Sequence, residues 1–295
     1  MKISEITELL LLAALWGGSF LFMRIAAPAL GPVWLIEMRV LLAGLALLPL
    51  LLRSNSWAIV RAKTIPLFVV GCCNSALPFL LLAFSSLSLP AGFTSILNAT
   101  APLFGTLVAV VWLKERLSLT QTIGLGLGFV GVVILIGIES FVATPAFTMA
   151  CGAGFAAAVM YAITAPYIKQ QLTGVSSLAI TTISQLSAAL CLLPALPFTV
   201  PETLPTPAVV LSVIALALLS TSLAYILYFR LIQSVGSTKA LTVTYLIPAF
   251  AMLWGALVLQ EPITLTMVTG GALVLLGTAI TNDLFKNLTI NNGKR

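Results

Sequence analysis

Three prolines in apolar stretches each follow a polar side chain by four residues. The pairs are Asn74 and Pro78, Asn98 and Pro102, and Thr244 and Pro248. In a helix, proline removes the hydrogen bond to the carbonyl four residues earlier, and hydrocarbon tolerates this only where a cavity or a neighbouring group satisfies that carbonyl. A polar side chain one turn away lies on about the same face, where it can hydrogen-bond the freed backbone or a solute. The pattern predicts two roles, backbone repair and the lining of a polar cavity, which are compatible with each other.

Aromatic and polar side chains also recur at helical spacing. Trp16, Ser19, Phe20 and Met23 follow the i, i+3, i+4, i+7 spacing of one helix face, Tyr161 and Thr164 occupy the matching positions of a later stretch, and Thr221, Tyr225 and Tyr228 form a third stripe. Residues at this spacing are neighbours on a helix surface, and aromatic residues near span ends form interfacial belts. The stripes therefore predict either packing surfaces or the wall of a cavity.

Two charged residues, Glu37 and Arg39, interrupt a long apolar stretch. A charge at bilayer depth costs at least about 2.5–3.5 kcal/mol on insertion scales, so it is expected to face a partner or a water-filled cavity. Residues two apart on a helix point to different faces, so these two are poor partners for one another. Arg39 is predicted to be either a structural anchor that snorkels toward the surface or a contact for a solute carboxylate.

Other charges and glycines near span ends have structural interpretations. Arg24 is predicted to be a surface anchor, and Glu115 and Glu261 each close a span just before a short connection, which favours a hairpin-stabilising role. Gly124 and Gly128 have the small-xxx-small spacing that permits close helix approach, and packing within one chain is favoured over a dimer contact.

The composition removes most catalytic chemistry. The 295 residues include no histidine, and Asp283 is the only aspartate. Imidazole bases, most catalytic zinc and iron sites, serine–histidine triads and aspartyl-protease pairs are therefore excluded. The four cysteines, Cys72, Cys73, Cys151 and Cys191, lie in apolar stretches, as small buried hydrophobes do. The sequence predicts no enzyme activity, no metal site and no cofactor.

The remaining composition is that of a membrane protein. Hydrophobic residues make up 60% of the chain and charged residues 7%, with a mean hydropathy of +1.15, whereas a soluble domain has about 25% charged residues. Proline, glycine and charges separate ten apolar spans of roughly 20 residues, the length that crosses a bilayer. The predicted spans are 8–28, 32–52, 64–85, 90–113, 119–138, 147–168, 175–197, 207–229, 238–259 and 263–282. The predicted fold class is an all-α polytopic membrane protein with ten transmembrane helices.

The basic residues predict the orientation of these spans. With the N-terminus in the cytoplasm, twelve of the fourteen Lys and Arg residues fall at cytoplasmic ends, namely Lys2, Arg53, Arg61, Lys63, Lys114, Arg116, Lys169, Arg230, Lys239, Lys286, Lys294 and Arg295. The positive-inside rule then places both termini in the cytoplasm. The net charge of +6 is accordingly a topology signal, and no nucleic-acid partner is predicted.

The two halves of the chain repeat at an offset of 146 residues. Ala101-Pro102-Leu103-Phe104 and Ile247-Pro248-Ala249-Phe250 both precede a glutamate, Glu115 or Glu261, that lies thirteen residues past the proline, and Arg39 corresponds to Gln185. Five spans per copy is an odd number, so the second copy enters the bilayer inverted, as in many secondary transporters. The predicted units are residues 1–142, holding the first five spans, and residues 143–295, holding the other five and a short cytoplasmic tail.

At this level the sequence resembles the drug/metabolite transporter superfamily, and within it the ten-span EamA-type transporters. The resemblance is carried by Ala14-Leu15-Trp16-Gly17-Gly18-Ser19-Phe20, Arg39, Lys114-Glu115-Arg116-Leu117 and Gln260-Glu261-Pro262. It covers nearly the whole chain. It implies an inner-membrane carrier, commonly an exporter of amino acids and related small metabolites, with a central cavity lined chiefly by spans 1, 3, 4, 6, 8 and 9.

The repeat and the proline-interrupted spans predict a transporter that works by alternating access. The expected activity is export or facilitated movement of amino acids or related metabolites. The alternatives are a drug or nucleoside exporter of the same fold and a channel or non-transporting scaffold. Glu37 is the only carboxylate clearly inside a span, so facilitated diffusion or exchange is predicted over obligatory proton antiport. The predicted partners are a small-molecule substrate and the lipid bilayer, and monomer and homodimer both stay open.

The candidate substrate-binding residues combine the proline pairs, the stripes and the buried arginine. They are Trp16, Ser19, Phe20, Met23, Arg39, Asn74, Pro78, Asn98, Pro102, Tyr161, Thr164, Tyr225, Tyr228, Thr244, Tyr245 and Pro248.

Overall fold

The chain folds into helices that run between two opposite faces. The structure, a computed structural model, describes residues 2–54, 56–112, 114, 116–137 and 144–282, and it contains no strand in these ranges. Seven helical segments in this part are long and apolar enough to cross a membrane, and the shorter apolar helices Ile247–Leu259 and Leu265–Thr281 accompany them. Large apolar side chains point outward along these helices, including Val133, Leu211 and Leu257. The exposed apolar surface fits a lipid environment, and the predicted all-α polytopic fold is confirmed.

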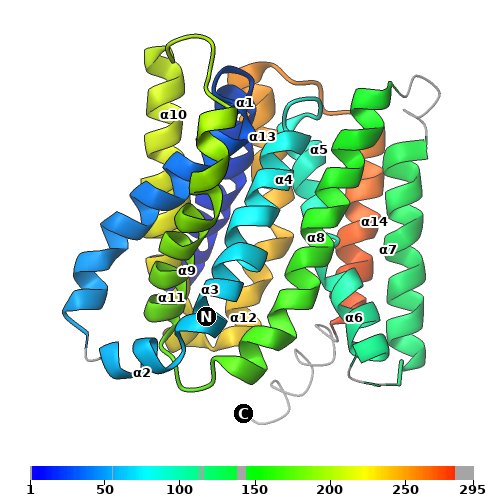
Figure 1. The fold of residues 1–295 in the computed structure, drawn as a ribbon. Coiled ribbons are helices and arrows are strands. Elements are labelled where there is room, and N and C mark those ends of the chain that lie inside the picture. The colour runs from blue at the N-terminus through cyan, green and yellow to red at the C-terminus, as the bar shows by residue number, and fades with distance from the viewer. Residues whose placement is uncertain (1, 55, 113, 115, 138–143, 283–295) are drawn as a thin grey trace.

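The first two predicted spans form one broken helix, α1 (Ile3–Leu52). Its backbone leaves the helical region at Gly31, where φ is 70° and ψ is 157°. A positive φ favours glycine, and the following Pro32 cannot donate a backbone hydrogen bond, so the helix turns back at this point. The two arms, 3–30 and 32–52, rise to one face of the protein and descend again (Figure 1). The long helix thus contains the two predicted crossings.

The third and eighth spans each contain a π-helical segment. The third consists of α3 (Thr64–Val70), η1 (Gly71–Ala76) and α4 (Leu77–Ser85), and the eighth of α10 (Pro207–Ala217), η4 (Leu218–Leu223) and α11 (Ala224–Val235). Since residue 218 lies 147 positions after residue 71, η1 and η4 correspond to within one residue of the repeat offset. Such bulges are rare and frequently lie at functional sites.

The fourth and ninth spans are interrupted just before their prolines. The fourth consists of α5 (Ala91–Asn98) and α6 (Ala101–Trp112), and the ninth of α12 (Ser237–Ala240), the 3-10 helix η5 (Leu241–Tyr245) and α13 (Ile247–Leu259). Pro102 and Pro248 occupy the second position of α6 and α13, where the missing N–H costs no intrahelical bond. Pro78 behaves differently, because the third span continues through it by widening into η1. Two of the three expected proline interruptions are therefore present as helix breaks.

The remaining helices are the other spans and one short connecting helix, α2. They are α2 (Trp57–Ala62), α7 (Leu119–Gly137), α8 (Pro145–Gln171), α9 (Ser177–Leu192) with its 3-10 extension η3 (Leu193–Phe198), and α14 (Leu265–Thr281). The side chains of Thr144, Ser176 and Thr264 accept hydrogen bonds from the first turns of α8, α9 and α14. Such caps satisfy backbone donors that the helix itself leaves unpaired.

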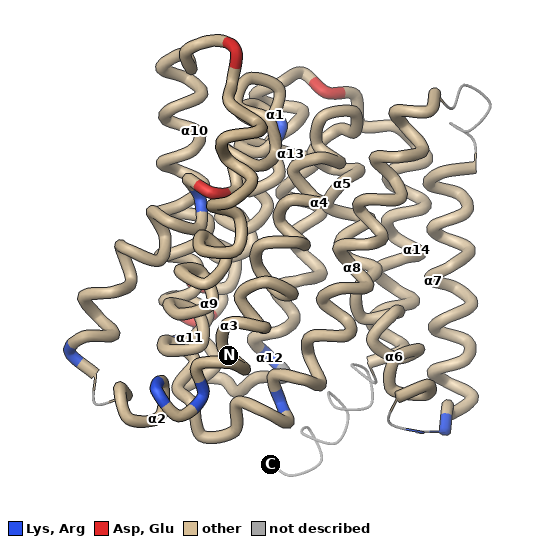
Figure 2. Tube along the Cα trace, in the orientation of Figure 1, with Lys and Arg blue, Asp and Glu red and all other residues tan. Residues whose placement is uncertain are grey.

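The charges mark the two faces of the bundle. Figure 2 shows Lys and Arg gathered mainly at the end where α1, α8 and α11 meet the short connections, and we call this end the basic face. It carries Lys2, Arg53, Arg61, Lys63, Lys114, Arg116, Lys169, Arg230 and Lys239. Glu202 and Glu261 lie in the α9–α10 and α13–α14 connections at the other end, which we call the opposite face (Figure 2). Successive spans run in alternating directions between these faces (Figure 1), so the second set of five is inverted.

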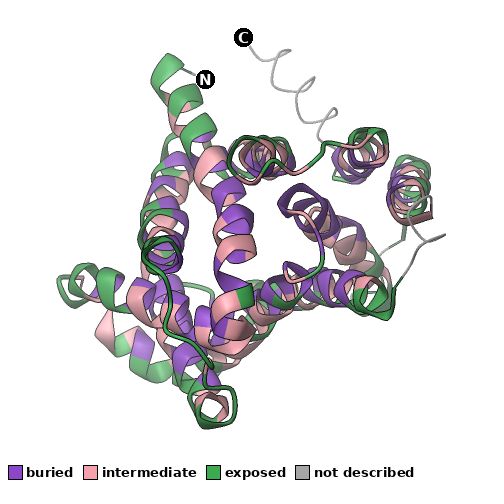
Figure 3. Ribbon diagram, turned by 90° about the horizontal axis from the view of Figure 1, so that it is seen from above, coloured by how far each residue is buried: buried purple, intermediate pink, exposed green. Residues whose placement is uncertain are grey.

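Glycines allow helices from the two halves to touch backbone to backbone. A Cβ on Gly17 of α1 would lie 2.7 Å from Phe250 Cβ and 2.9 Å from Ala251 N of α13. A Cβ on Gly131 of α7 would lie 2.7 Å from Gly270 O of α14. A Cβ on Gly124 would lie 2.8 Å from Gly277 O, so the predicted packing of the Gly124 region within one chain is confirmed. Buried residues face the middle of the bundle and exposed residues its rim (Figure 3).

Candidate functional site

A cavity lies between the interrupted parts of the fourth and ninth spans. Its volume is ≈ 130 Å³. It is lined by Ser95, Asn98, Ala99, Ala101, Pro102, Tyr161, Thr244, Tyr245, Ile247, Pro248, Leu275 and Thr278. Asn98 and Thr244, like Pro102 and Pro248, are 146 positions apart, so this cavity lies between equivalent parts of the two repeats. Six candidate residues predicted from the sequence, namely Asn98, Pro102, Tyr161, Thr244, Tyr245 and Pro248, are brought together here.

Some polar groups of this cavity already have hydrogen-bond partners among the described residues, and Asn98 Oδ1 has none. The Thr244 hydroxyl donates to Leu241 O at 2.8 Å, and the Tyr245 hydroxyl accepts from Asn282 Nδ2 at 3.1 Å. Asn98 Oδ1 is buried and has no hydrogen-bond partner among the described residues. A buried acceptor without a partner costs about 1–3 kcal/mol, which a bound donor group recovers. The Thr244 hydroxyl is therefore bonded within its own turn, while Asn98 has an acceptor free for a solute.

A second and larger cavity adjoins the first at the basic face. Its volume is ≈ 340 Å³. It is lined by Pro102, Gly105, Thr106, Ala109, Val110, Arg116, Leu117, Gln121, Thr281 and Asn282. Pro102 lines both cavities. Together they extend from the connection between α6 and α7 to the broken part of the fourth span.

Polar and aromatic side chains surround Arg39, and one of them, Tyr161, also lines the first cavity. Arg39 is only 5% exposed. Its Nε donates to Thr221 Oγ1 at 3.1 Å, and its Cζ lies 3.7 Å from the centre of the Phe79 ring. Tyr161 and Tyr225 lie near its guanidinium. We call Met23, Arg39, Phe79, Tyr161, Thr221 and Tyr225 the arginine cluster.

Aromatic rings extend the arginine cluster along the first and eighth spans. Trp16 meets the Tyr225 ring edge-on, with centroids 6.1 Å apart, and lies against Tyr228 at 5.2 Å. Trp16, Arg39, Tyr161, Tyr225 and Tyr228, predicted from four separate stretches, therefore lie in one region. Aromatic pairs at these separations stabilise packing beyond the area that they bury.

The remaining candidate residues line neither cavity, and of them only Met23 belongs to the arginine cluster. Phe20 and Met23 belong to the main apolar core, and Met23 Sδ is 3.9 Å from Arg39 Nη1. The Thr164 hydroxyl donates to Met160 O at 2.7 Å and lies 3.2 Å from Cys73 O. Ser19 is buried in α1, whereas Asn74 and Pro78 lie in the third span, outside the residues that line the two cavities. Their assignment as binding residues stays a prediction.

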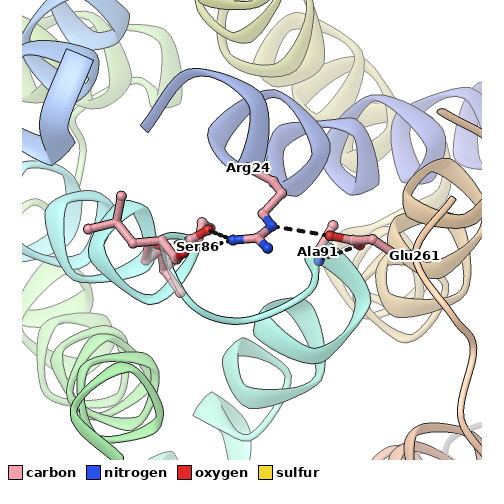
Figure 4. Close-up of polar contacts among 6 residues, drawn as sticks. Arg24, Ser86, Ala91 and Glu261 are labelled. Carbon is pink, nitrogen blue, oxygen red and sulfur yellow. Dashed lines mark hydrogen bonds and ion pairs between the residues drawn. The ribbon is translucent and has the colours of Figure 1, made fainter. Parts of the chain in front are cut away.

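An ion pair at the opposite face ties four segments together. Arg24 Nε lies 3.2 Å from Glu261 Oε1, and Arg24 Nη1 donates to Ser86 O and Leu87 O, both at 2.8 Å. Glu261 Oε2 accepts from Ala91 N at 2.9 Å. Figure 4 shows Arg24 reaching from α1 between the α4–α5 turn and Glu261. We call this arrangement the latch.

Sequence reasoning assigned the two latch residues separate roles and did not pair them. Their opposite charges at the same end of the predicted spans were a signal for the pair, but two such ends need not be neighbours. Glu261 also does more than stabilise its own hairpin, because it bonds α5 and α1. Glu115, its counterpart in the first repeat, lies outside the described residues.

Both halves of the chain match one known protein family. The model of the EamA-like transporter family matches residues 4–137 and again residues 148–283. The chain belongs to the EamA-like transporter family. The two matches cover both sets of five spans of this EamA-like protein, and they agree with its resemblance to the drug/metabolite transporter superfamily.

Named relatives of this EamA-like protein are similar over nearly their whole length. An uncharacterized transporter of Archaeoglobus fulgidus is 24% identical over 274 residues, which is 91% of this chain and 95% of the relative. A probable terminal-alkyne amino-acid exporter of Streptantibioticus cattleyicolor is 26% identical over 291 residues, covering 96% of this chain and 95% of the relative. A solved crystal structure with 18% identity has a TM-score of 0.67 and covers 96% of this chain and 99% of its own. The EamA-like protein is accordingly a multi-pass membrane transporter, and the solved structure shows the same fold.

Proposed function

We propose that this EamA-like protein moves amino acids or related small metabolites across the cell inner membrane by alternating access. The substrate occupies the cavity between the fourth and ninth spans and the neighbouring arginine cluster. The basic face is cytoplasmic, as the positive-inside rule requires, and so are both chain ends. The physiological direction is export or facilitated diffusion, and residues 1–142 and 143–295 are the two inverted units that move against each other.

The observation that carries this proposal is the pairing of Pro102 and Pro248 in the wall of one cavity. Discontinuous helices from two inverted repeats meet at the substrate site in several transporter folds, because unwound backbone there can bind solute. The broken segments have few internal hydrogen bonds to lose when a helix half tilts. Bending at these two points therefore changes which face reaches the cavity at little cost.

The two faces differ in a way that supports a basic-face-open state. The larger cavity extends from Arg116 and Gln121 at the basic face to Pro102. At the opposite face, the latch joins α1, the α4–α5 turn, α5 and the α13–α14 connection. A solute in the cavity would thus have its path on the cytoplasmic side.

The substrate class rests on a relative and on the lining residues. The Streptantibioticus cattleyicolor relative is named as a probable exporter of a terminal-alkyne amino acid. Here, amide, hydroxyl and aromatic groups surround the cavity, which suits a small solute with both polar and apolar parts. Glu37 is the only carboxylate clearly inside a predicted span, and we propose exchange or facilitated diffusion over obligatory proton antiport.

Counterflow in proteoliposomes tests this function. Vesicles preloaded with an unlabelled mixture of amino acids should accumulate external labelled leucine or phenylalanine transiently, with or without an imposed pH gradient. A carrier shows this overshoot and saturates with solute. Flux without counterflow would indicate a channel, and no flux of any amino acid would contradict the proposal.

Pro248→Ala should slow counterflow about tenfold or more. Alanine restores the backbone N–H and favours a continuous ninth span, so the tilt of the α13 half has to break helical hydrogen bonds, and each ~1.4 kcal/mol added to the barrier costs tenfold in rate. Pro207→Ala is the matched control, because Pro207 lies at the exposed start of α10, and it should leave the rate unchanged. Equal rates in both variants would show that the interruption has no part in transport.

A further inference from the structure

The arginine cluster contains a buried positive charge without a negative partner. Among the described residues, the ion pairs join Arg24 to Glu261 and Arg230 to Glu8, and no carboxylate lies within 4.0 Å of Arg39. Its Nε donates to Thr221 and its Nη1 lies 3.9 Å from Met23 Sδ, while Nη2 has no hydrogen-bond partner in the same part of the chain. Buried charges in proteins are normally paired. Among the described residues, Arg39 therefore lacks the counter-ion that a buried charge normally has.

The second repeat shows how much of this arrangement is structural. Gln185 Nε2 donates to Ser75 Oγ at 3.2 Å, as Arg39 Nε donates to Thr221 Oγ1 at 3.1 Å. Residues 39 and 185, and likewise 75 and 221, are 146 positions apart, so these are the same contact in the two repeats. A neutral amide makes the interhelical bond in one copy. The packing of the spans therefore does not require the positive charge of Arg39.

The depth of Arg39 agrees with a substrate site. It lies eight residues after the break at Gly31, which is about 12 Å down a helix that rises 1.5 Å per residue. In a hydrocarbon core of about 30 Å this places it close to the midplane. Secondary transporters of inverted-repeat design bind their substrates at that depth.

The arginine cluster is continuous with the cavity and with an aromatic wall. Tyr161 lines the cavity and lies near Arg39. Tyr225, from the eighth span, also lies near Arg39 and contacts Trp16. A solute in the cavity therefore lies against Tyr161, which is also a neighbour of the Arg39 guanidinium.

We propose that the arginine cluster binds the carboxylate of a small monocarboxylate substrate, with its apolar part against Trp16 and Tyr228. This inference rests on the proposed transport function and narrows its substrate class. One guanidinium balances one negative charge, so a monocarboxylate fits better than a dianionic phosphate ester. Guanidinium and carboxylate also match in geometry, which makes this pair strong and specific.

Paired acid and amide probes test the charge directly. The probes are leucine, phenylalanine and 4-phenylbutyrate, each compared with its primary amide, and their binding to the full-length purified protein is measured by equilibrium dialysis. For wild type, at least one acid should bind about tenfold or more tighter than its amide, because hydrogen bonds to charged groups are stronger than neutral ones. Arg39→Gln should abolish this preference, and Arg39→Lys should keep part of it.

Gln185→Ala is the matched control, since it removes the neutral counterpart of Arg39, and it should leave the preference for acids unchanged. Equal losses of acid and amide binding in Arg39→Gln would assign Arg39 a structural role and overturn the proposal. Binding of none of these acids by wild type, or a preference for the amides, would also overturn it. Counterflow of amino acids that persists equally in wild type and Arg39→Gln would leave the transport function standing while the anion site fails.

Discussion

Replacing Glu261 with glutamine is expected to open the opposite face. Glu261 Oε1 pairs with Arg24 Nε and Oε2 accepts a hydrogen bond from Ala91 N. The Glu261 side chain is only 14% exposed. Removing its charge leaves the Arg24 guanidinium, which is 30% exposed, without its counter-ion. For a pair that is partly screened by solvent, we expect a loss of roughly 1–3 kcal/mol from the latched state, or about a tenfold shift or more in population.

Spin-label distances report this opening. Labels at Ser88, in the α4–α5 turn, and Leu265, at the start of α14, are both exposed and lie on the two sides of the latch. Pulsed electron resonance should show a longer distance gaining population in Glu261→Gln and in Arg24→Gln. The double variant should show no further gain, because either change alone already breaks the pair.

Glu202→Gln serves as the control for the latch. Glu202 is an exposed glutamate in the α9–α10 connection, so the same change of charge there should leave the distances as in wild type. Distances that stay the same in Glu261→Gln, or that change as much in Glu202→Gln, would show that the latch does not hold this face closed.

Gly131→Ala should destabilise the protein by about 1–3 kcal/mol, as overpacking of a well-packed interface does. The added Cβ would lie 2.7 Å from both Gly270 O and Val274 N. These neighbours are backbone atoms of α14, which cannot move aside as a flexible side chain can. The midpoint of thermal unfolding, followed by the monodisperse fraction in size-exclusion chromatography, measures the effect.

Gly126 provides the comparison on the same helix. A Cβ at Gly126 has no atom within 4 Å, so Gly126→Ala should be neutral or slightly stabilising through the better helix propensity of alanine. Similar unfolding midpoints for the two variants would contradict the close α7–α14 contact.

Much of the architecture follows from local sequence features. Charged residues, glycines and prolines end most of the spans, and most helix bounds lie within a few residues of the predicted ones because these residues disrupt helices or require water. Two ends differ more, since α1 begins at Ile3 and α11 continues through Arg230 to Val235. The repeat offset adds long-range information, since it places Pro102 and Pro248 in equivalent positions of inverted copies. For this reason the cavity between the fourth and ninth spans could be anticipated in outline from one sequence.

The side-chain pairing within the bundle could not be anticipated. Arg39 meets Thr221, which is 182 residues away, and Arg24 meets Glu261 across 237 residues. Which faces of two spans meet depends on the packing of all the spans together, and a spacing of residues along one helix carries no information about the partner helix. The π-helices η1 and η4 likewise depend on tertiary packing, and only Pro78 gave a local sign of irregular structure in the third span.

Access to Asn98 from both faces of the membrane is the most direct test of alternating access. In a variant with Ala at the four cysteine positions, a single cysteine replaces Asn98, and a membrane-impermeant maleimide is applied to inside-out and right-side-out vesicles. Alternating access predicts labelling from the basic face at rest and from both faces while amino acids exchange. Labelling from one face alone under every condition, or no labelling at all, would contradict the account.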